Sequence, residues 1–206
     1  MNIPDQKGAW NKLYGSQQRP WRGTIANKIS FPFEKGDVIA DIGCGNGKTS
    51  SALIEAGYNV IGIDVSDVAA EACVKLYGDR MRVICASSDS IPLDDGELGG
   101  AVLIHLLEHL NDNELKRTAE ELIRVLRPGA KIFVRVFHRD DMRSGKGERI
   151  DERTVLRGNG IAYRYFTENE LTDVFSAFSV ITMERIAETT KFEGTRSRIE
   201  AVFEKY

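Results

Sequence analysis

The stretch that decides the fold is VIADIGCGNG, at residues Val38–Gly47. Its first half is a short apolar run, which is typical of a strand buried on both faces of a parallel sheet. Its second half places glycines at alternate positions, where they permit a tight turn and close approach of a ligand to the backbone. A helical pattern follows at residues 49–56 and stops at Gly57. The free N–H groups at such a helix start suit a nucleotide-like ligand or a carboxylate.

The spacing of these glycines separates the loop from two other nucleotide-binding motifs. A dinucleotide fingerprint requires G-x-G-x-x-G, and Lys48 stands where its third glycine belongs. A P-loop ending in Gly47-Lys48-Thr49 requires its first glycine at the position of Ile42. The P-loop interpretation therefore fails, and a nicotinamide-dependent enzyme is disfavoured.

Two acidic residues follow the next predicted strands. Asp64 follows the strand predicted at residues 59–63, where a carboxylate can accept hydrogen bonds from both ribose hydroxyls of a nucleoside. The alternative role is a helix cap, for which Ser66 or Asp67 is also available. Asp89 follows the strand predicted at residues 82–86 and can accept from an exocyclic amine such as that of adenine, or cap a helix.

The remaining pattern indicates an α/β fold. Strands are predicted at residues 101–104 and 131–137, and helices at 68–77 and 111–126, which implies right-handed crossovers and a parallel sheet. Thr167–Glu170 resembles a capping box, so a helix should run from there to about Ala177. Strands predicted at 178–186 and 197–203 have no helix between them and should pair antiparallel.

A charged, glycine-rich segment at residues 138–165 interrupts this pattern. It follows the carboxyl end of a strand, where open α/β sheets bind ligands, so we expect a loop insertion on the substrate side. The alternative is a solvated, disordered insertion. Basic residues in and around it can form a rim for nucleic acid or bind an anionic small substrate: Arg135, Arg139, Arg143, Lys146, Arg149, Arg153, Arg157 and Arg164.

Bulk composition fits one soluble domain spanning residues 1–206. The net charge is −3 and the pI about 5.7, which does not suggest broad phosphate-driven binding of nucleic acid. The three cysteines match no metal-binding spacing, so no metal site is predicted, and we expect reduced thiols. Neither a signal peptide nor a membrane span is predicted, and we expect a cytoplasmic protein.

Taken together, five motifs resemble those of the class I S-adenosylmethionine-dependent methyltransferases. The motifs are Val38–Gly47, Ile61–Asp64, Ser88–Pro92, Leu107–Leu110 and Arg124–Gly129. The resemblance covers nearly the whole chain. It implies a Rossmann-like, doubly wound seven-stranded sheet of order 3-2-1-4-5-7-6, with strand 7 antiparallel. It also implies S-adenosylmethionine as cofactor and S-adenosylhomocysteine as product.

The resemblance assigns a set of residues to the cofactor. The loop residues would hold the methionine end, Asp64 would accept from the ribose hydroxyls, and Val65 would pack on the adenine. Asp89 would accept from the adenine amine, the backbone N–H of Ser90 would meet a ring nitrogen, and His105 would contact the amino-acid end. The whole set is Asp41, Gly43, Cys44, Gly45, Asp64, Val65, Asp89, Ser90 and His105.

The N-terminal residues 1–30 resemble the lid helices of family members that act on small molecules. The aromatic segment Trp10–Tyr14, with Arg19–Arg22 behind it, would close over the cofactor; the alternative is an ordinary amphipathic helix. Methyl transfer from a sulfonium is a direct displacement that needs alignment and water exclusion, so a general base is optional. His105 is the candidate base, with His109 and His138 as further candidates.

We therefore expect a methyltransferase for a small-molecule acceptor, supported by the short chain and the acidic pI. The alternatives are an RNA or protein methyltransferase, or a cofactor-binding regulator without enzymatic activity. Nucleic acid is the less expected partner and a membrane is not expected. The acceptor atom and the oligomeric state stay open.

Overall fold

The computed structural model describes residues 6–16, 29–190 and 194–206. The helices are α1 (Gln6–Ser16), α2 (Lys48–Glu55), α3 (Asp67–Tyr77), α4 (Asp112–Val125) and α5 (Glu168–Val174), with 3-10 turns at Gly78–Arg80 and Leu107–His109. The strands are β1 (Val38–Ile42), β2 (Asn59–Asp64), β3 (Met81–Cys85), β4 (Leu98–Ile104), β5 (Leu126–Phe137), β6 (Glu148–Arg149), β7 (Thr154–Leu156), β8 (Ala162–Arg164), β9 (Phe178–Thr189) and β10 (Thr195–Lys205). No helix in these ranges has the length and apolar character needed to cross a membrane.

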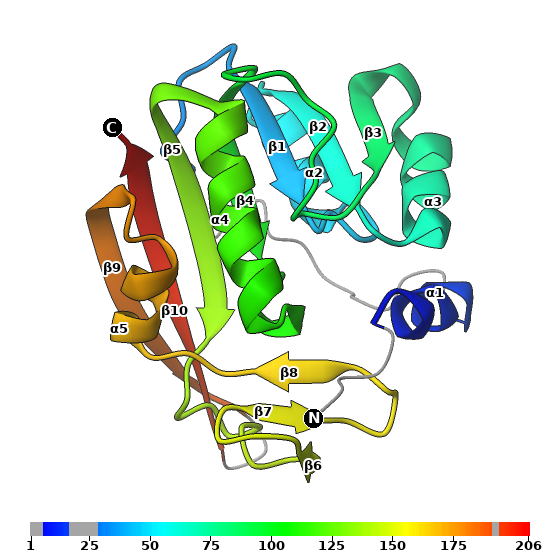
Figure 1. Cartoon of the computed structure of the whole chain (residues 1–206). Helices are drawn as coiled ribbons and strands as arrows, with labels where there is room; N and C mark the ends of the chain where they lie inside the picture. The colour runs from blue at the N-terminus through cyan, green and yellow to red at the C-terminus, as the bar shows by residue number, and fades with distance from the viewer. Residues whose placement is uncertain (1–5, 17–28, 191–193) are drawn as a thin grey trace.

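The main sheet has seven strands in the order β3-β2-β1-β4-β5-β10-β9 (Figure 1). The pairs from β3 to β5 are parallel, whereas β10 is antiparallel to both β5 and β9. With β9 as the sixth strand and β10 as the seventh, this is the predicted order 3-2-1-4-5-7-6. The predicted Rossmann-like fold class is confirmed.

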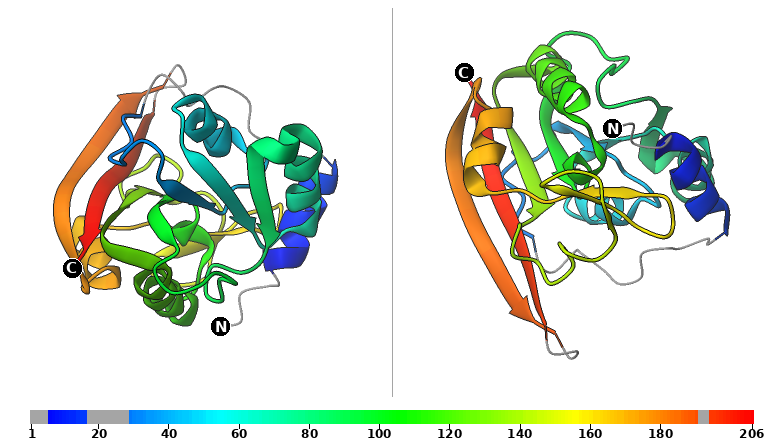
Figure 2. Two further views of the ribbon diagram at one scale, coloured as in Figure 1. Left: turned by 90° about the horizontal axis from the view of Figure 1, so that it is seen from above. Right: turned by 60° about the horizontal axis from the view of Figure 1, so that its bottom comes forward.

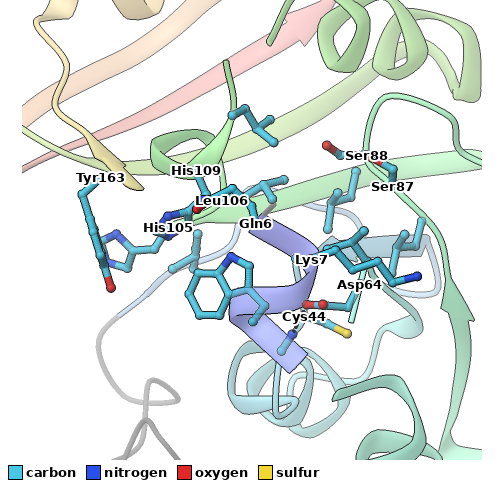
Figure 3. A pocket seen from close by; sticks show the side chains of 18 of the residues that line it. Gln6, Lys7, Cys44, Asp64, Ser87, Ser88, His105, Leu106, His109 and Tyr163 are labelled. Carbon is cyan, nitrogen blue, oxygen red and sulfur yellow. Dashed lines mark hydrogen bonds between the residues drawn. The ribbon is translucent and has the colours of Figure 1, made fainter. Parts of the chain in front are cut away.

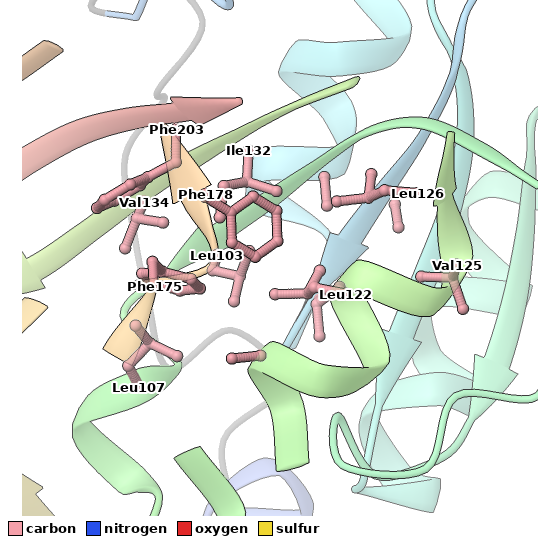
Figure 4. Packing of buried hydrophobic residues seen from close by; sticks show 14 of the residues in the cluster. Leu103, Leu107, Leu122, Val125, Leu126, Ile132, Val134, Phe175, Phe178 and Phe203 are labelled. Atoms are coloured by element: carbon pink, nitrogen blue, oxygen red, sulfur yellow. The ribbon is translucent and has the colours of Figure 1, made fainter. Parts of the chain in front are cut away.

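Residues that alternate along each strand build two cores, one on each face of the sheet. In β1, Ala40 and Ile42 join the cluster that includes Leu122 of α4 and Phe175, just after α5 (Figure 4). Ile39, the residue before Ala40, joins the cluster on the other face, which α2 and α3 complete. Both faces are thus buried, which explains why the central strands are almost entirely apolar.

Capping boxes fix the two helices on the α4 side. The Asn111 side chain accepts from the backbone N–H of Glu114, whose side chain accepts from the backbone N–H of Asn111. Thr167 and Glu170 form the same reciprocal pair at α5, as their spacing predicts. The helix α5 ends at Val174, three residues before the predicted end.

Two central strands begin earlier than predicted. The strand β4 begins at Leu98 and includes Gly99 and Gly100, where a Cβ would clash with Asp37 and Phe33. The strand β5 begins at Leu126, which pairs with Leu98. The next pair is Gly100 with Lys131, so β5 contains additional residues there that have no partner in β4. The Arg-Pro-Gly run that ends α4 is therefore part of an irregular strand.

The charged segment 138–165 forms a second, antiparallel sheet of order β6-β7-β8. Its buried face includes Val155, Ile161 and Tyr163, and Trp10 and Leu13 of α1 pack against it. The small sheet and α1 lie beyond the carboxyl ends of the parallel strands (Figures 1 and 2). The segment is therefore a packed element and not a disordered insertion.

Candidate active site

A cavity of about 640 Å³ lies at the carboxyl ends of the parallel strands, between them, α1 and the small sheet (Figure 3). Its residues come from the glycine loop, the ends of β2, β4 and β5, and the covering elements. The principal ones are Gln6, Lys7, Trp10, Tyr14, Gly43, Cys44, Gly45, Asp64, Val65, Ser87, Ser88, His105, Leu106, His109, Phe137, Arg143, Arg157, Tyr163 and Arg196. Most of the predicted cofactor residues are among them.

The glycine loop passes close under α1 in a backbone conformation that side chains rarely adopt. Gly43, Gly45 and Gly47 have φ angles of 75°, 53° and 75°. A Cβ on Gly45 would lie 2.3 Å from the hydroxyl of Tyr14, and one on Gly47 would lie 2.3 Å from the ring of Tyr77. The dihedral angles therefore favour glycine at all three positions, and the buried Tyr77 ring also leaves no space for a side chain at Gly47.

Two buried aspartates hold this loop. Asp64 is 8% exposed, and its two carboxylate oxygens accept from the backbone N–H of Gly45 at 2.8 Å and of Ser66 at 2.9 Å. Burial raises its pKa above the usual value. Asp41 is 2% exposed beneath the loop and accepts from the Ser50 hydroxyl at 2.5 Å. Burial raises the pKa of Asp41 to about 7, and the charge of Asp64 adds to this shift.

His105 is held at the cavity edge by a buried acid. Its backbone is in the left-handed region, with φ 56°, and it is the one non-glycine residue with positive φ in the described ranges. Its Nδ1 lies 2.8 Å from Oε1 of Glu108, which also accepts from the backbone N–H of Phe137. The imidazole stacks on the Phe137 ring at 4.2 Å between centroids. The ring is thus fixed, with Nε2 the nitrogen not bound to Glu108.

Aromatic rings form the wall opposite the glycine loop. His109 donates from Nδ1 to the carbonyl of Ala162 in β8 at 2.8 Å, and burial lowers its pKa. Its ring makes edge contacts with Trp10 at 4.8 Å and with Tyr163 at 4.9 Å. His109 therefore ties α1 and the small sheet to the end of β4.

The structure separates the predicted basic residues into two groups. Arg143 and Arg157 reach the cavity, together with Arg196 of β10. Four others form ion pairs outside it: Arg135 with Glu200, Arg139 and Arg153 with Glu170, and Arg164 with Asp112. Sequence reasoning missed Arg196, because nothing local marks a residue of the last strand as close to the glycine loop.

Three of the predicted cofactor residues do not line the cavity. Asp41 lies beneath the loop, Asp89 pairs with Arg117 at 3.3 Å, and the N–H of Ser90 is bound to the carbonyl of Ser87. Ser87 and Ser88 line the cavity at this point instead. The adenine role of Asp89 and Ser90 stays a prediction.

The other candidates are placed as follows. His138 is buried beyond β5, with Nε2 3.5 Å from Glu168, and does not line the cavity among the described residues. The segment Arg19–Arg22 lies outside the described residues. Cys44 and Cys73 are buried free thiols, whereas Cys85 is exposed.

Comparison with known proteins identifies the family of the central part of the chain. Residues 40–134 match the family described as "Methyltransferase domain". A "SAM-dependent methyltransferase" structure from Methanosarcina mazei superposes with a TM-score of 0.75 at 23% identity, covering 85% of this chain and 98% of that one. This likeness shows the shared fold.

Curated relatives are tRNA methyltransferases. The tRNA N(3)-cytidine methyltransferase of Xenopus tropicalis is 28% identical over 82% of this chain and 54% of its own length. The tRNA N(3)-methylcytidine methyltransferase of Schizosaccharomyces pombe is 28% identical over 81% of this chain and 62% of its own. The chain thus spans about half the length of the curated relatives that it matches.

These relatives contradict the predicted partner. A small-molecule substrate was expected, with nucleic acid the less expected alternative, yet the relatives act on tRNA. The prediction rested on the net charge of −3, which averages over the whole surface. The net charge does not show that three arginines line one cavity.

Proposed function

Because the chain belongs to the class I S-adenosylmethionine-dependent methyltransferases, we propose that its cavity binds S-adenosylmethionine and methylates a nucleotide of RNA. The observation that carries this proposal is the division of the cavity. Cys44 and Asp64 lie on one side of the cavity, by the glycine loop, and Tyr163 lies on the other, where Arg157 packs on its ring (Figure 3). The first suits a nucleoside cofactor, and the second suits a nucleotide acceptor.

The residues at the first end fit the cofactor. Each carboxylate oxygen of Asp64 accepts one backbone N–H and keeps a further lone pair for a ribose hydroxyl. The glycines leave the backbone open to close approach, and Val65 and Leu106 offer apolar contact for adenine. Gly43, Cys44 and Gly45 would hold the methionine end, with His105 beside it.

The second end fits a base that has left its stack. Trp10, Phe137 and Tyr163 present aromatic surface to the cavity, and single-stranded bases stack on such rings. Stacking is tolerant of sequence, so it suits an enzyme that selects its nucleotide by additional contacts. The helix α1 would act as a lid, because Trp10 and Tyr14 cover both ends.

The chemistry demands little of the protein beyond alignment. The bound cofactor supplies an electrophilic methyl group on a sulfonium. The N3 of neutral cytosine carries a lone pair, so attack at this atom requires no prior deprotonation. The protein's task is then to hold the base in line and to exclude water, for which α1 and the small sheet are placed. His105 would orient the reactants and accept a proton only where the acceptor releases one.

The cofactor site is tested by calorimetric titration of S-adenosylmethionine and S-adenosylhomocysteine. Micromolar binding is expected for the wild type, and at least a tenfold loss for Asp64→Ala, because buried hydroxyls lose a charged acceptor. The matched control is Asp67→Ala, an exposed aspartate at the start of α3. Equal binding by Asp64→Ala and wild type would contradict the site.

The acceptor class is tested separately with labelled cofactor. Wild-type protein is incubated with unmodified tRNA transcripts, and the label retained on RNA is counted after precipitation. Incorporation that ribonuclease releases is expected. Cofactor binding without any incorporation into RNA would contradict the RNA acceptor and leave the cofactor site standing.

A further inference from the structure

Three arginines from distant parts of the chain converge on one wall of the cavity. Arg143 follows β5, Arg157 follows β7, and Arg196 lies on β10. They lie at the end of the cavity away from the glycine loop, where Phe137 and Tyr163 supply aromatic surface. The guanidinium of Arg157 lies 4.1 Å from the centroid of Tyr163, and that of Arg196 lies 4.8 Å from the centroid of Phe137.

Two buried groups hold the arginines together. Asp141 is 2% exposed; one of its oxygens accepts from the backbone N–H of Arg143 and the other from Nε of Arg196 at 2.7 Å. Tyr165, also 2% exposed, accepts from Arg157 at 2.7 Å and donates to the backbone carbonyl of Arg143 at 3.0 Å. Hydrogen bonds to the packed protein therefore hold the backbone of Arg143 and the side chains of Arg157 and Arg196, whereas the side chain of Arg143 is exposed at the cavity.

This wall carries more positive charge than its own acids neutralise. Among the described residues, the three arginines form a single ion pair with a carboxylate, which is the pair between Arg196 and Asp141. Burial, followed by the charges of Arg196 and Arg157, lowers the pKa of Arg143. Nε of Arg157 is buried without a hydrogen-bond acceptor. Other arginines of this region, such as Arg139, Arg153 and Arg164, are by contrast paired with acids.

We propose that Arg143, Arg157 and Arg196 form a clamp for the phosphodiester beside the nucleotide that is methylated. This proposal rests on the proposed function, because it assigns the arginines to the RNA and not to the cofactor. Guanidinium groups present paired N–H donors that match phosphate oxygens, and phosphate contacts fix the register of a bound strand. The clamp would place the adjacent base against Tyr163 and Phe137, facing the methyl donor.

The test compares Arg143→Ala with wild type in tRNA methylation. The clamp predicts a KM for tRNA about tenfold higher, an unchanged kcat, and unchanged calorimetric affinity for S-adenosylmethionine. The slope of log affinity against log salt should fall by about 0.7 for one lost contact to a single strand. Arg143→Lys, which keeps the charge without the paired donors, should recover part of the affinity.

The matched control is Arg149→Ala, an exposed arginine of the same small sheet that does not line the cavity. It should leave the KM unchanged. An Arg143→Ala enzyme with the KM and salt slope of wild type would overturn the clamp. So would a loss of cofactor affinity with an unchanged KM for tRNA, because the arginine would then bind the carboxylate of the cofactor.

A second arm separates failure of the clamp from failure of the RNA acceptor. Cytidine and cytidine 5′-monophosphate are titrated into the protein saturated with S-adenosylhomocysteine. Tighter binding of the monophosphate, lost in Arg143→Ala, would support the clamp even if the enzyme methylates no tRNA. Equal binding of the two compounds to wild type would overturn it.

Discussion

Replacement of Asp41 by asparagine should change how the stability of the protein depends on pH. Asp41 is fully enclosed beneath the glycine loop, and burial raises its pKa to about 7. In the unfolded chain an aspartate has a pKa of about 3.9. Between these two values the folded protein binds a proton that the unfolded chain does not. The resulting stabilisation is complete below the unfolded pKa and is lost as the pH rises through the folded pKa.

The magnitude follows from the size of this shift. Each pKa unit corresponds to about 1.4 kcal/mol, so the rise from the unfolded value to about 7 represents about 4 kcal/mol in total. Because Asp41 is only half ionised at pH 7, about 2 kcal/mol of that should be lost between pH 5 and pH 7. Asparagine keeps an oxygen that can accept from the Ser50 hydroxyl but cannot ionise, so the Asp41→Asn variant should lack this loss.

The assay is urea unfolding at pH 5, 6, 7 and 8, followed by circular dichroism. The free energy of unfolding of wild type should fall relative to Asp41→Asn by about 2 kcal/mol from pH 5 to pH 7 and should level off by pH 8. Titrating groups that do not interact with Asp41 are common to both proteins and cancel in the difference. Asp67→Asn, at an exposed position, should follow wild type. Parallel curves for wild type and Asp41→Asn would refute the assignment of the buried proton to Asp41.

Three further changes test the packing that supports the site. Leu122→Ala removes a fully buried side chain of α4 and should lower the free energy of unfolding, measured by urea denaturation, by about 2–5 kcal/mol. A decrease of less than about 1 kcal/mol would contradict the core described above. Asn111→Ala removes the cap of α4 and should lower the same quantity by about 1 kcal/mol, and an unchanged denaturation midpoint would argue against the capping box. Gly47→Ala places a Cβ against Tyr77 at a positive φ and should lower the melting temperature, whereas Gly145→Ala, with open space around it, should not. Equal melting temperatures for the two glycine variants would mean that the loop adjusts freely.

Local patterns predicted the sheet because they depend on neighbours in the chain. The run Val38–Gly47 combines an apolar strand with a turn that only glycines permit, and both requirements act over a few residues. The capping box at Thr167 is equally local. The crossover rule predicted the parallel strands, whereas the order of the strands came from the resemblance to the class I methyltransferases, and the structure confirms it.

The acceptor end of the cavity was harder to predict, because distant segments create it. Tyr163 reaches the cavity through the small sheet, which has short strands without clear periodicity, and Arg196 reaches it from the last strand. Asp89 follows its strand as predicted, but Arg117 from α4 pairs with it, and this is a contact across 28 positions of the chain. The net charge led to the wrong prediction of a small-molecule substrate for a related reason, because it does not show where the arginines lie.

The most direct test of the account is to identify the methylated product on RNA. Unmodified tRNA transcripts are incubated with the protein and S-adenosylmethionine, digested to nucleosides, and analysed by mass spectrometry. The account predicts a methylated nucleoside, with cytidine as the first base to examine, that forms with wild type and Asp67→Ala but not with Asp64→Ala. No methylated nucleoside from a protein that binds S-adenosylmethionine, with transfer instead to a small molecule, would contradict the central claim.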